Sequence, residues 1–251
     1  MRKLGVLALM VMLGFCVQTF AQTPAQAPAK PKAATAPKAS ADAKIGTSAA
    51  RAYDRALLRP ALLKEKAPET FQVKFTTTRG DFVVTVNRTW APIGADRFYN
   101  LVKHHFYDNA SFFRVVPGFV VQFGLSAYPP VSAAWEKANL QDEPVIQSNK
   151  RGYLTYAKTS MPNTRSTQIF INLSDNAGHL DRQGFSPFGF VDAQGMKVVD
   201  MLYDQYGDSG GPDQDQISKL GKPYLDKGWP KLDSIKTATL VVAAPEAAKP
   251  Q

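Results

Sequence analysis

Cysteine and histidine are scarce in this chain of 251 residues. The single Cys16 lies near the start, so the chain beyond it offers no thiol for a disulfide, a zinc site or a nucleophile. The three histidines are His104, His105 and His179. We interpret His104 and His105 as the end of a helix, where positive charge is favourable, rather than as metal ligands.

Several motifs that define enzyme classes are also missing. The sequence contains no G-x-S-x-G elbow, no Walker loop, no G-x-G-x-x-G and no H-E-x-x-H. Asp175, Asp181 and Asp192 could form paired carboxylates for acid/base chemistry, but each has a glycine three residues later, which favours turns. We therefore predict no cofactor and no metal site.

One long apolar run is present, at residues 4–17, directly after Arg2 and Lys3. A basic start, an apolar core and small residues ending at Ala21 are typical of a cleaved secretory signal peptide, which we predict over residues 1–21. The core is shorter than the ~20 residues of a transmembrane helix, and no later segment supplies such a run. We expect export, to a bacterial periplasm, and no integral membrane span.

Residues 22–48 are rich in Ala, Pro, Lys and Thr, with prolines too closely spaced for a helix, and we predict a disordered tether. Of the net charge of +9, the leader holds +2 and this tether +3, which leaves +4 for residues 49–251. No stripe of Arg and Lys interleaves with aromatic residues there. The sequence therefore argues against a nucleic-acid partner.

The remaining residues predict a helical extension over 49–66 and one domain over 67–245. Residues 71–75 and 82–86 flank the turn signal at 78–81, a pattern typical of a β-hairpin. Further strands are expected at 112–124, 152–156, 168–173, 188–191 and 235–242, and helices at 92–102 and 195–202. Many short strands with two central helices indicate a mainly β fold, a closed β-barrel capped by two α-helices.

The run at residues 112–124 places one cation and one amide, Arg114 and Gln122, among apolar residues. Arg114 has five donors and no acceptor, so on a half-buried strand it must face a carbonyl, a carboxylate or a ligand. The alternative is a core strand whose arginine extends to solvent. These residues alone leave both interpretations open.

Six motifs occur in a fixed order along residues 70–205: F-x-R-V-V-P-G-F-x-x-Q-x-G at 112–124, P-N-T at 162–164, S-x-Q-x-F-I at 166–171, L-D at 180–181, F-G at 188–189 and G-M-x-V-V-D at 195–200. In this order they resemble the cyclophilin family of peptidyl-prolyl isomerases. The resemblance implies an eight-stranded antiparallel barrel whose groove lies on its outer face.

Carried over by position, the resemblance implies a catalytic arginine at Arg114 and an apolar proline pocket. The implied catalytic residues are Arg114, Phe119, Gln122 and Phe170. The implied substrate-binding residues are Phe113, Val120, Ala157, Lys158, Gln168, His179, Leu180 and Phe185. The substrate would be proline-containing unfolded or partly folded polypeptide, bound by a monomer.

Four positions depart from the family pattern. Phe113 stands where histidine is common, Val120 replaces a methionine, His179 replaces a tryptophan, and Phe185 aligns approximately with a histidine. Because His179 lacks the indole N–H donor, we predict weak binding of cyclosporin-type macrocycles. These departures leave an alternative open, namely a non-catalytic peptide-binding chaperone or a scaffolding module with a degenerate groove.

Overall fold

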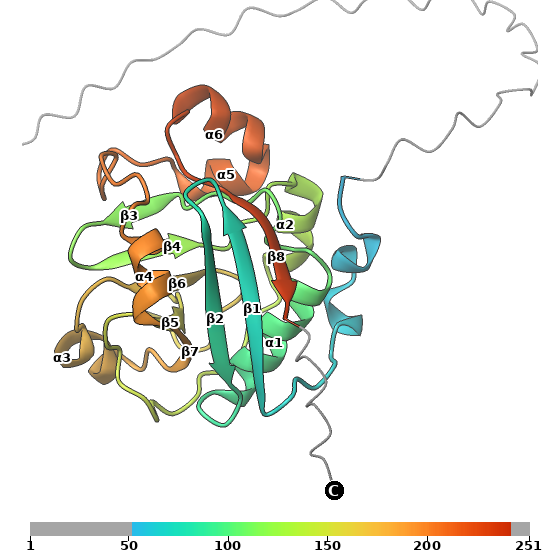
Figure 1. Ribbon diagram of the computed structural model, residues 1–251. Helices are drawn as coiled ribbons and strands as arrows, with labels where there is room; N and C mark the ends of the chain where they lie inside the picture. Colours follow the sequence, from blue (N-terminus) through green and yellow to red (C-terminus); the bar gives the residue numbers. More distant parts are fainter. Residues whose placement is uncertain (1–51, 242–251) are drawn as a thin grey trace, which may run out of the picture. The chain divides into compact units, whose positions relative to one another are not determined.

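Eight strands form one sheet in the order β3-β4-β6-β5-β7-β2-β1-β8, and all neighbouring strands are antiparallel (Figure 1). The strands are β1 (Thr70–Thr77), β2 (Asp81–Asn87), β3 (Arg114–Val116), β4 (Val120–Phe123), β5 (Tyr153–Tyr156), β6 (Ile169–Asn172), β7 (Pro187–Val191) and β8 (Ile235–Leu240). The mainly β, antiparallel fold expected from the sequence is therefore confirmed.

The computed structural model describes residues 52–241, which belong to one compact unit. The predicted signal peptide (1–21) and tether (22–48) lie outside the described residues. So do residues 49–51 of the predicted extension and 242–245 of the predicted domain.

The sheet curls into a half-barrel rather than the closed barrel that we expected (Figure 1). Its edge strands β3 and β8 do not pair along their lengths. A single bridge joins Ser111 and Ser234, the residues that precede them, with bonds from Phe112 N to Asp233 O and from Ile235 N to Ala110 O. Because β3 has three residues, it offers little backbone for a longer ladder.

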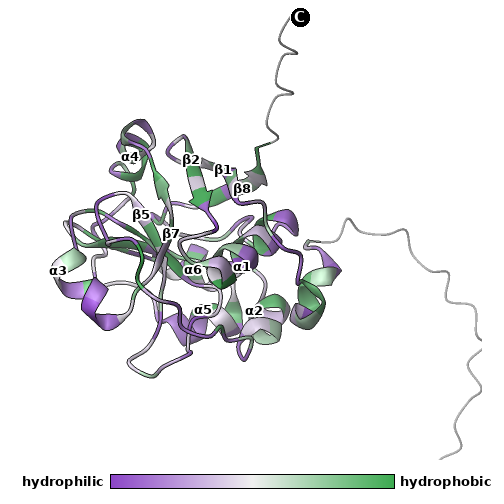
Figure 2. Ribbon diagram, turned by 90° about the horizontal axis from the view of Figure 1, so that it is seen from below, coloured by the Kyte–Doolittle hydropathy of each residue, from purple (hydrophilic) through white to green (hydrophobic). Residues whose placement is uncertain are grey.

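The core lies inside the curl of the sheet. Strand β1 alternates strictly, so that Phe71, Val73 and Phe75 are buried between exposed residues, and β2 repeats the pattern. The rings of Phe75 and Phe82 stack at 5.1 Å across the two strands. Figure 2 shows hydrophobic colour along the central strands and mainly hydrophilic loops around them.

Both predicted capping helices are present. Helix α1 (Pro92–Lys103) begins with proline at its first position and buries Phe98, Leu101 and Val102 against the sheet. Helix α4 (Ala193–Val199) is capped by Asp192, whose side chain accepts a bond from Gly195 N at 2.7 Å. The sequence predicted both helices, at 92–102 and at 195–202, and α4 lies two to three residues earlier than its predicted bounds.

Four further helices lie in segments where the sequence had predicted none. They are α2 (Pro129–Trp135), α3 (Ala177–Leu180), α5 (Gln214–Leu220) and α6 (Lys222–Gly228). Helix α5 follows Asp213, whose side chain accepts a bond from Gln216 N, and it ends at Gly221 with φ of 66°. Helices α5 and α6 pack together over one end of the sheet, above β3 and β8 in Figure 1.

The N-terminal extension is not an α-helix within the described residues. It forms two 3-10 helices, η1 (Arg55–Leu58) and η2 (Pro60–Leu62), because Pro60 interrupts the helical pattern. Leu57 is buried, and its carbonyl accepts a bond from the Trp135 indole at 2.8 Å. Glu65 binds Asn100 on α1, so the extension lies against α1 and α2.

Candidate active site

Arg114 and Gln122 face each other across β3 and β4. The run at 112–124 is two strands joined by a turn at Gly118, whose φ of 71° suits glycine. The register pairs Arg114 with Gln122, and Gln122 in turn with Phe170 on β6. Because side chains alternate along strands, these three lie on the face of the sheet opposite the core residue Val121.

An apolar pocket of about 170 Å³ lies beside this row. Its base is formed by three buried side chains, Val120, Phe170 and Leu180, with Phe119 and Phe185 partly buried around them. The rings of Phe170 and Phe185 meet edge to face at 5.7 Å. The residues that line the pocket are Arg114, Phe119, Val120, Gln122, Ala157, Lys158, Phe170, Leu180 and Phe185.

Hydrogen bonds hold the polar side of the pocket. Arg114 Nη1 donates to Gln122 Oε1 at 3.1 Å, and Gln122 Nε2 donates to Gln168 Oε1 at 2.8 Å. Arg114 Nε donates to Asp208 Oδ1 at 2.5 Å, and this bond lowers the pKa of the Asp208 carboxyl. The guanidinium also lies 5.8 Å from the Phe119 ring centroid. Arg114 thus presents fixed donors at the edge of an apolar surface.

Two amide side chains, the buried Asn149 and the half-buried Asn176, support the loops that carry the pocket residues. Asn149 Nδ2 donates to Asp181 Oδ1 and to Phe185 O, both at 2.8 Å, which fixes the loop after Leu180. Asn176 Nδ2 donates to Phe119 O at 2.9 Å. No sequence motif pointed to Asn149 or Asn176. Asp181 therefore helps to hold this loop in place. Its carbonyl accepts a bond from Gly184 N, in agreement with the turn that Gly184 indicated in the sequence.

Three predicted site residues lie outside this pocket. Phe113 was expected to bind substrate, but it is 2% exposed and packs against Ile217 and Leu225 beneath α5 and α6. His179 is exposed on α3 and bonds to Gln183. Gln168 reaches the site through Gln122 and lines a different pocket. The predicted weakness of macrocycle binding stays a prediction.

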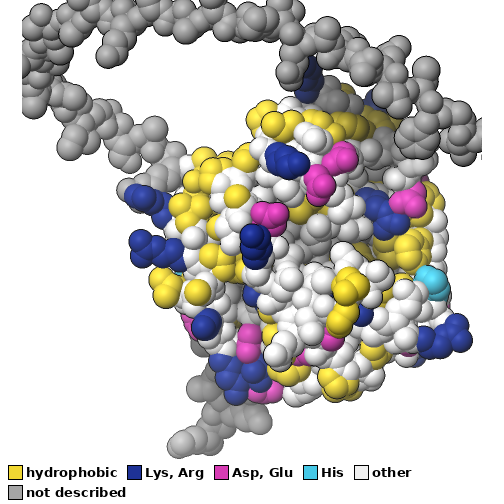
Figure 3. Space-filling model, turned by 180° about the vertical axis from the view of Figure 1, so that it is seen from behind, with side chains coloured by type: hydrophobic (Ala, Val, Ile, Leu, Met, Phe, Trp, Pro, Cys, Tyr) yellow, Lys and Arg dark blue, Asp and Glu magenta, His cyan; other side chains and the backbone are white. Residues whose placement is uncertain are grey.

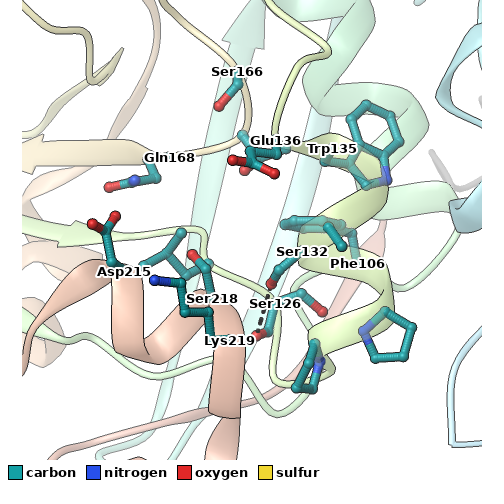
Figure 4. Close-up of a pocket in the computed structure, with 15 residues that line it drawn as sticks. Phe106, Ser126, Ser132, Trp135, Glu136, Ser166, Gln168, Asp215, Ser218 and Lys219 are labelled. Atoms are coloured by element: carbon teal, nitrogen blue, oxygen red, sulfur yellow. Dashed lines mark hydrogen bonds between the residues drawn. The ribbon is translucent and has the colours of Figure 1, made fainter. Parts of the chain in front are cut away.

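The second pocket, of about 620 Å³, lies between α2 and α5. Figure 4 shows Ser132, Trp135 and Glu136 on one side and Asp215, Ser218 and Lys219 on the other, with Gln168 at one end. Both walls come from helices that the sequence had not predicted. Gln168 therefore lines the larger pocket, whose lining is both polar and apolar, and bonds to Gln122, which lines the small apolar pocket.

The described residues, 52–241, contain neither a cluster of metal-binding side chains nor a membrane-spanning helix. In this range no three His, Cys, Asp or Glu side chains are grouped so as to hold a metal ion. Over the same residues, no helix combines the length and apolar character needed to cross a membrane. Figure 3 shows Lys and Arg scattered among Asp and Glu on the face seen there, without one dominant charged patch.

A curled eight-stranded antiparallel sheet with an arginine beside an apolar pocket on its outer face defines the cyclophilin-like class. The fold is similar to a crystal structure of a cyclophilin type peptidyl-prolyl cis-trans isomerase from Cryptosporidium parvum, with a TM-score of 0.52 and 20% identity. The match covers 70% of this chain and 99% of that one.

Sequence comparisons lead to the family. The model described as "Cyclophilin type peptidyl-prolyl cis-trans isomerase/CLD" matches residues 72–222. Peptidyl-prolyl cis-trans isomerase A of Dickeya dadantii is 32% identical over 156 residues, covering 61% of this chain and 82% of that relative. An Acinetobacter baylyi peptidyl-prolyl cis-trans isomerase is 33% identical, covering 56% and 76%. The chain belongs to the cyclophilin-type peptidyl-prolyl cis-trans isomerase family, and it is an enzyme of that activity.

Proposed function

We propose that this enzyme accelerates X-Pro rotation in exported folding proteins, with Arg114 as donor to the prolyl nitrogen. The observation that supports the proposal most is the position of Arg114, whose guanidinium borders a pocket built from Val120, Phe170 and Leu180. We propose that the pocket holds the proline ring while the flanking carbonyl turns, so that rotation begins from one orientation.

The chemistry of the X-Pro bond explains why such a site needs no nucleophile. Rotation breaks amide resonance over a barrier of ~18–20 kcal/mol, so the uncatalysed step takes ~10–100 s. The twisted amide has a pyramidal, basic nitrogen and less charge separation than the planar amide. An apolar pocket with a donor aimed at that nitrogen therefore favours the twisted state over the planar one.

Arg114 has the free donor that this mechanism requires. Its Nε and Nη1 atoms each bind a protein acceptor, whereas Nη2 binds none among residues 52–241. A charge-assisted hydrogen bond made only in the twisted state contributes about 1.5–3 kcal/mol, which corresponds to about tenfold to a hundredfold in rate.

The cellular setting is the other part of the proposal. The basic, apolar and small residues at 1–21 form the pattern of a secretory leader, which supports export, and we propose a bacterial periplasm as the destination. We propose that the enzyme acts there as a monomer on proline-containing, unfolded or partly folded polypeptides.

A prolyl-peptide assay tests the catalytic proposal, with wild type, Arg114→Ala and Arg151→Ala compared at equal concentration. Arg151 is a matched control, because it also pairs with an aspartate, Asp200, at 2.6 Å and does not line the pocket. We expect wild type and Arg151→Ala to exceed the spontaneous rate and Arg114→Ala to fall towards it. Spontaneous rates for all three proteins would favour the binding-module alternative.

Export is tested by expressing the full chain in a Gram-negative host. We expect the protein to be released by osmotic shock and to begin at Gln22, after cleavage behind Ala21. An intact N-terminus on protein retained in the cytoplasm would contradict the proposed setting and leave the catalytic proposal standing.

A further inference from the structure

Arg114 is bound by a carboxylate from a distant part of the chain. Asp208 lies 94 residues further along, and its Oδ1 accepts the bond from Arg114 Nε at 2.5 Å. Within the described residues it is the one acidic side chain that pairs with Arg114. The bond therefore links the candidate catalytic arginine to a segment outside the motifs that identify the family.

The segment that contains Asp208 is folded by its own hydrogen bonds. Gly207 N donates to Asp204 O at 2.9 Å, and Gly210 N donates to Tyr206 O at 3.0 Å. The Trp229 indole, just after α6, donates to Gly210 O at 2.9 Å. These bonds close a compact turn on both sides of Asp208, so the backbone that carries its side chain is held in place.

A separate hydrophobic cluster anchors the neighbouring helices α5 and α6 to the sheet, and Trp229, which packs against it, bonds to Gly210 of the segment. Phe113, Leu125, Ile217 and Leu225 pack together, and they join the β3 and β4 region to α5 and α6. Phe113 directly precedes Arg114 in the sequence. The burial of Phe113 and the placement of Asp208 are thus parts of one arrangement around Arg114.

Two bonds from different nitrogen atoms fix the plane of a guanidinium, because the group is rigid and planar. Arg114 Nε donates to Asp208, and Arg114 Nη1 donates to Gln122. Asp208 does not line the apolar pocket, and its side chain is 64% exposed. It binds Arg114 from the solvent side and leaves the pocket open.

We propose that Asp208 is a positioning residue, which orients the Arg114 guanidinium so that Nη2 faces the prolyl nitrogen of the bound peptide. The inference rests on the proposed function of Arg114. A blocking role is not favoured, because the carboxylate lies outside the pocket that the proline ring would fill.

The test measures kcat and KM separately for wild type, Asp208→Ala and Asp208→Glu with an X-Pro peptide. Exposed ion pairs are weak, so we expect Asp208→Ala to lower kcat about twofold to fivefold and to leave KM unchanged. Asp208→Glu restores most of kcat, because it returns a carboxylate. Raising the salt concentration lowers wild-type kcat part of the way towards that of Asp208→Ala, since salt weakens solvent-exposed ion pairs.

Asp200→Ala is the matched control, because Asp200 forms a similarly exposed pair with Arg151. It leaves kcat, KM and the salt response unchanged. The chemical shift of Arg114 Nε–H, followed by NMR, moves in Asp208→Ala and not in Asp200→Ala.

An active wild type with unchanged or raised kcat in Asp208→Ala overturns this inference alone. A wild type without isomerase activity overturns the proposed function together with it.

Discussion

Arg165 Nη1 donates to Glu143 Oε2 at 2.9 Å, and the two side chains are 1% and 4% exposed. Glu143 also accepts bonds from Ile93 N and Gly94 N, at the start of α1. This ion pair therefore joins the helix that caps the sheet to the loop between β5 and β6, which leads from Lys158 at the pocket to Phe170.

Glu143→Gln tests the contribution of this pair to stability. The substitution keeps the shape of the side chain but removes the charge that bonds to the buried Arg165, which leaves only the Asp142 carboxylate, at 3.6 Å, beside it. Removal of one partner from a buried pair costs about 3–5 kcal/mol, so we expect the free energy of unfolding in urea to fall by about that amount.

Glu69→Gln is the control, because Glu69 pairs with Arg88 at 3.7 Å and is 63% exposed. It should change the free energy of unfolding by less than about 1 kcal/mol. Equal effects of the two substitutions would show that burial does not determine the strength of the pair.

Ile217→Ala tests the anchoring of α5 to the sheet. Ile217 is 1% exposed in the cluster with Phe113, whereas Leu220 on the same helix is 51% exposed. We expect Ile217→Ala to cost about 2–5 kcal/mol in urea unfolding and Leu220→Ala to cost less than about 0.5 kcal/mol. Similar losses at the two positions would contradict the anchoring by this cluster.

Acid should loosen the N-terminal extension through Asp54. Asp54 Oδ2 bonds to His104 Nδ1 at 2.7 Å, and its Oδ1 accepts from Ala56 N. These two bonds lower the pKa of the Asp54 carboxyl. A lowered pKa in the folded state means that the stabilisation is present above the unfolded pKa, near ~4, and is lost as pH falls through the folded value.

The measurement is the melting temperature of wild type and Asp54→Asn at pH 5, 4 and 3. We expect the wild type to lose more than the variant over this range, so that the two curves converge in acid. Parallel curves would show that the Asp54 carboxylate does not stabilise the folded protein.

The pocket residues were predicted because they lie in or beside the motifs that resemble the cyclophilin family; those on strands are Arg114, Val120, Gln122 and Phe170. Arg114, Gln122 and Phe170 share a face by the period of two, and the register brings them together. The core of β1 and β2 followed from the same alternation. The shared face and the core of these strands both depend on the period of two along a strand, which can be read directly from the sequence.

The features that were not predicted, namely the additional helices and the burial of Phe113, depend on contacts between distant segments. No helix was predicted at α2, although it begins with Pro129 and Pro130, and proline is tolerated in the first turn of a helix. Asp213 and Gly221 mark the ends of α5 and are the signal by which that helix could have been found. No local pattern predicted that Phe113 would pack under α5, where it is buried and does not line the apolar pocket.

We propose that Arg114 acts on the twisted amide and that the apolar pocket holds the proline ring. The most direct test is the separate measurement of kcat and KM for wild type, Arg114→Ala and Phe170→Ala with one X-Pro peptide. We predict that Arg114→Ala lowers kcat about tenfold to a hundredfold at nearly constant KM, and that Phe170→Ala raises KM. An Arg114→Ala enzyme with wild-type kcat and a raised KM would contradict the account, because Arg114 would then bind the planar peptide without favouring its rotation.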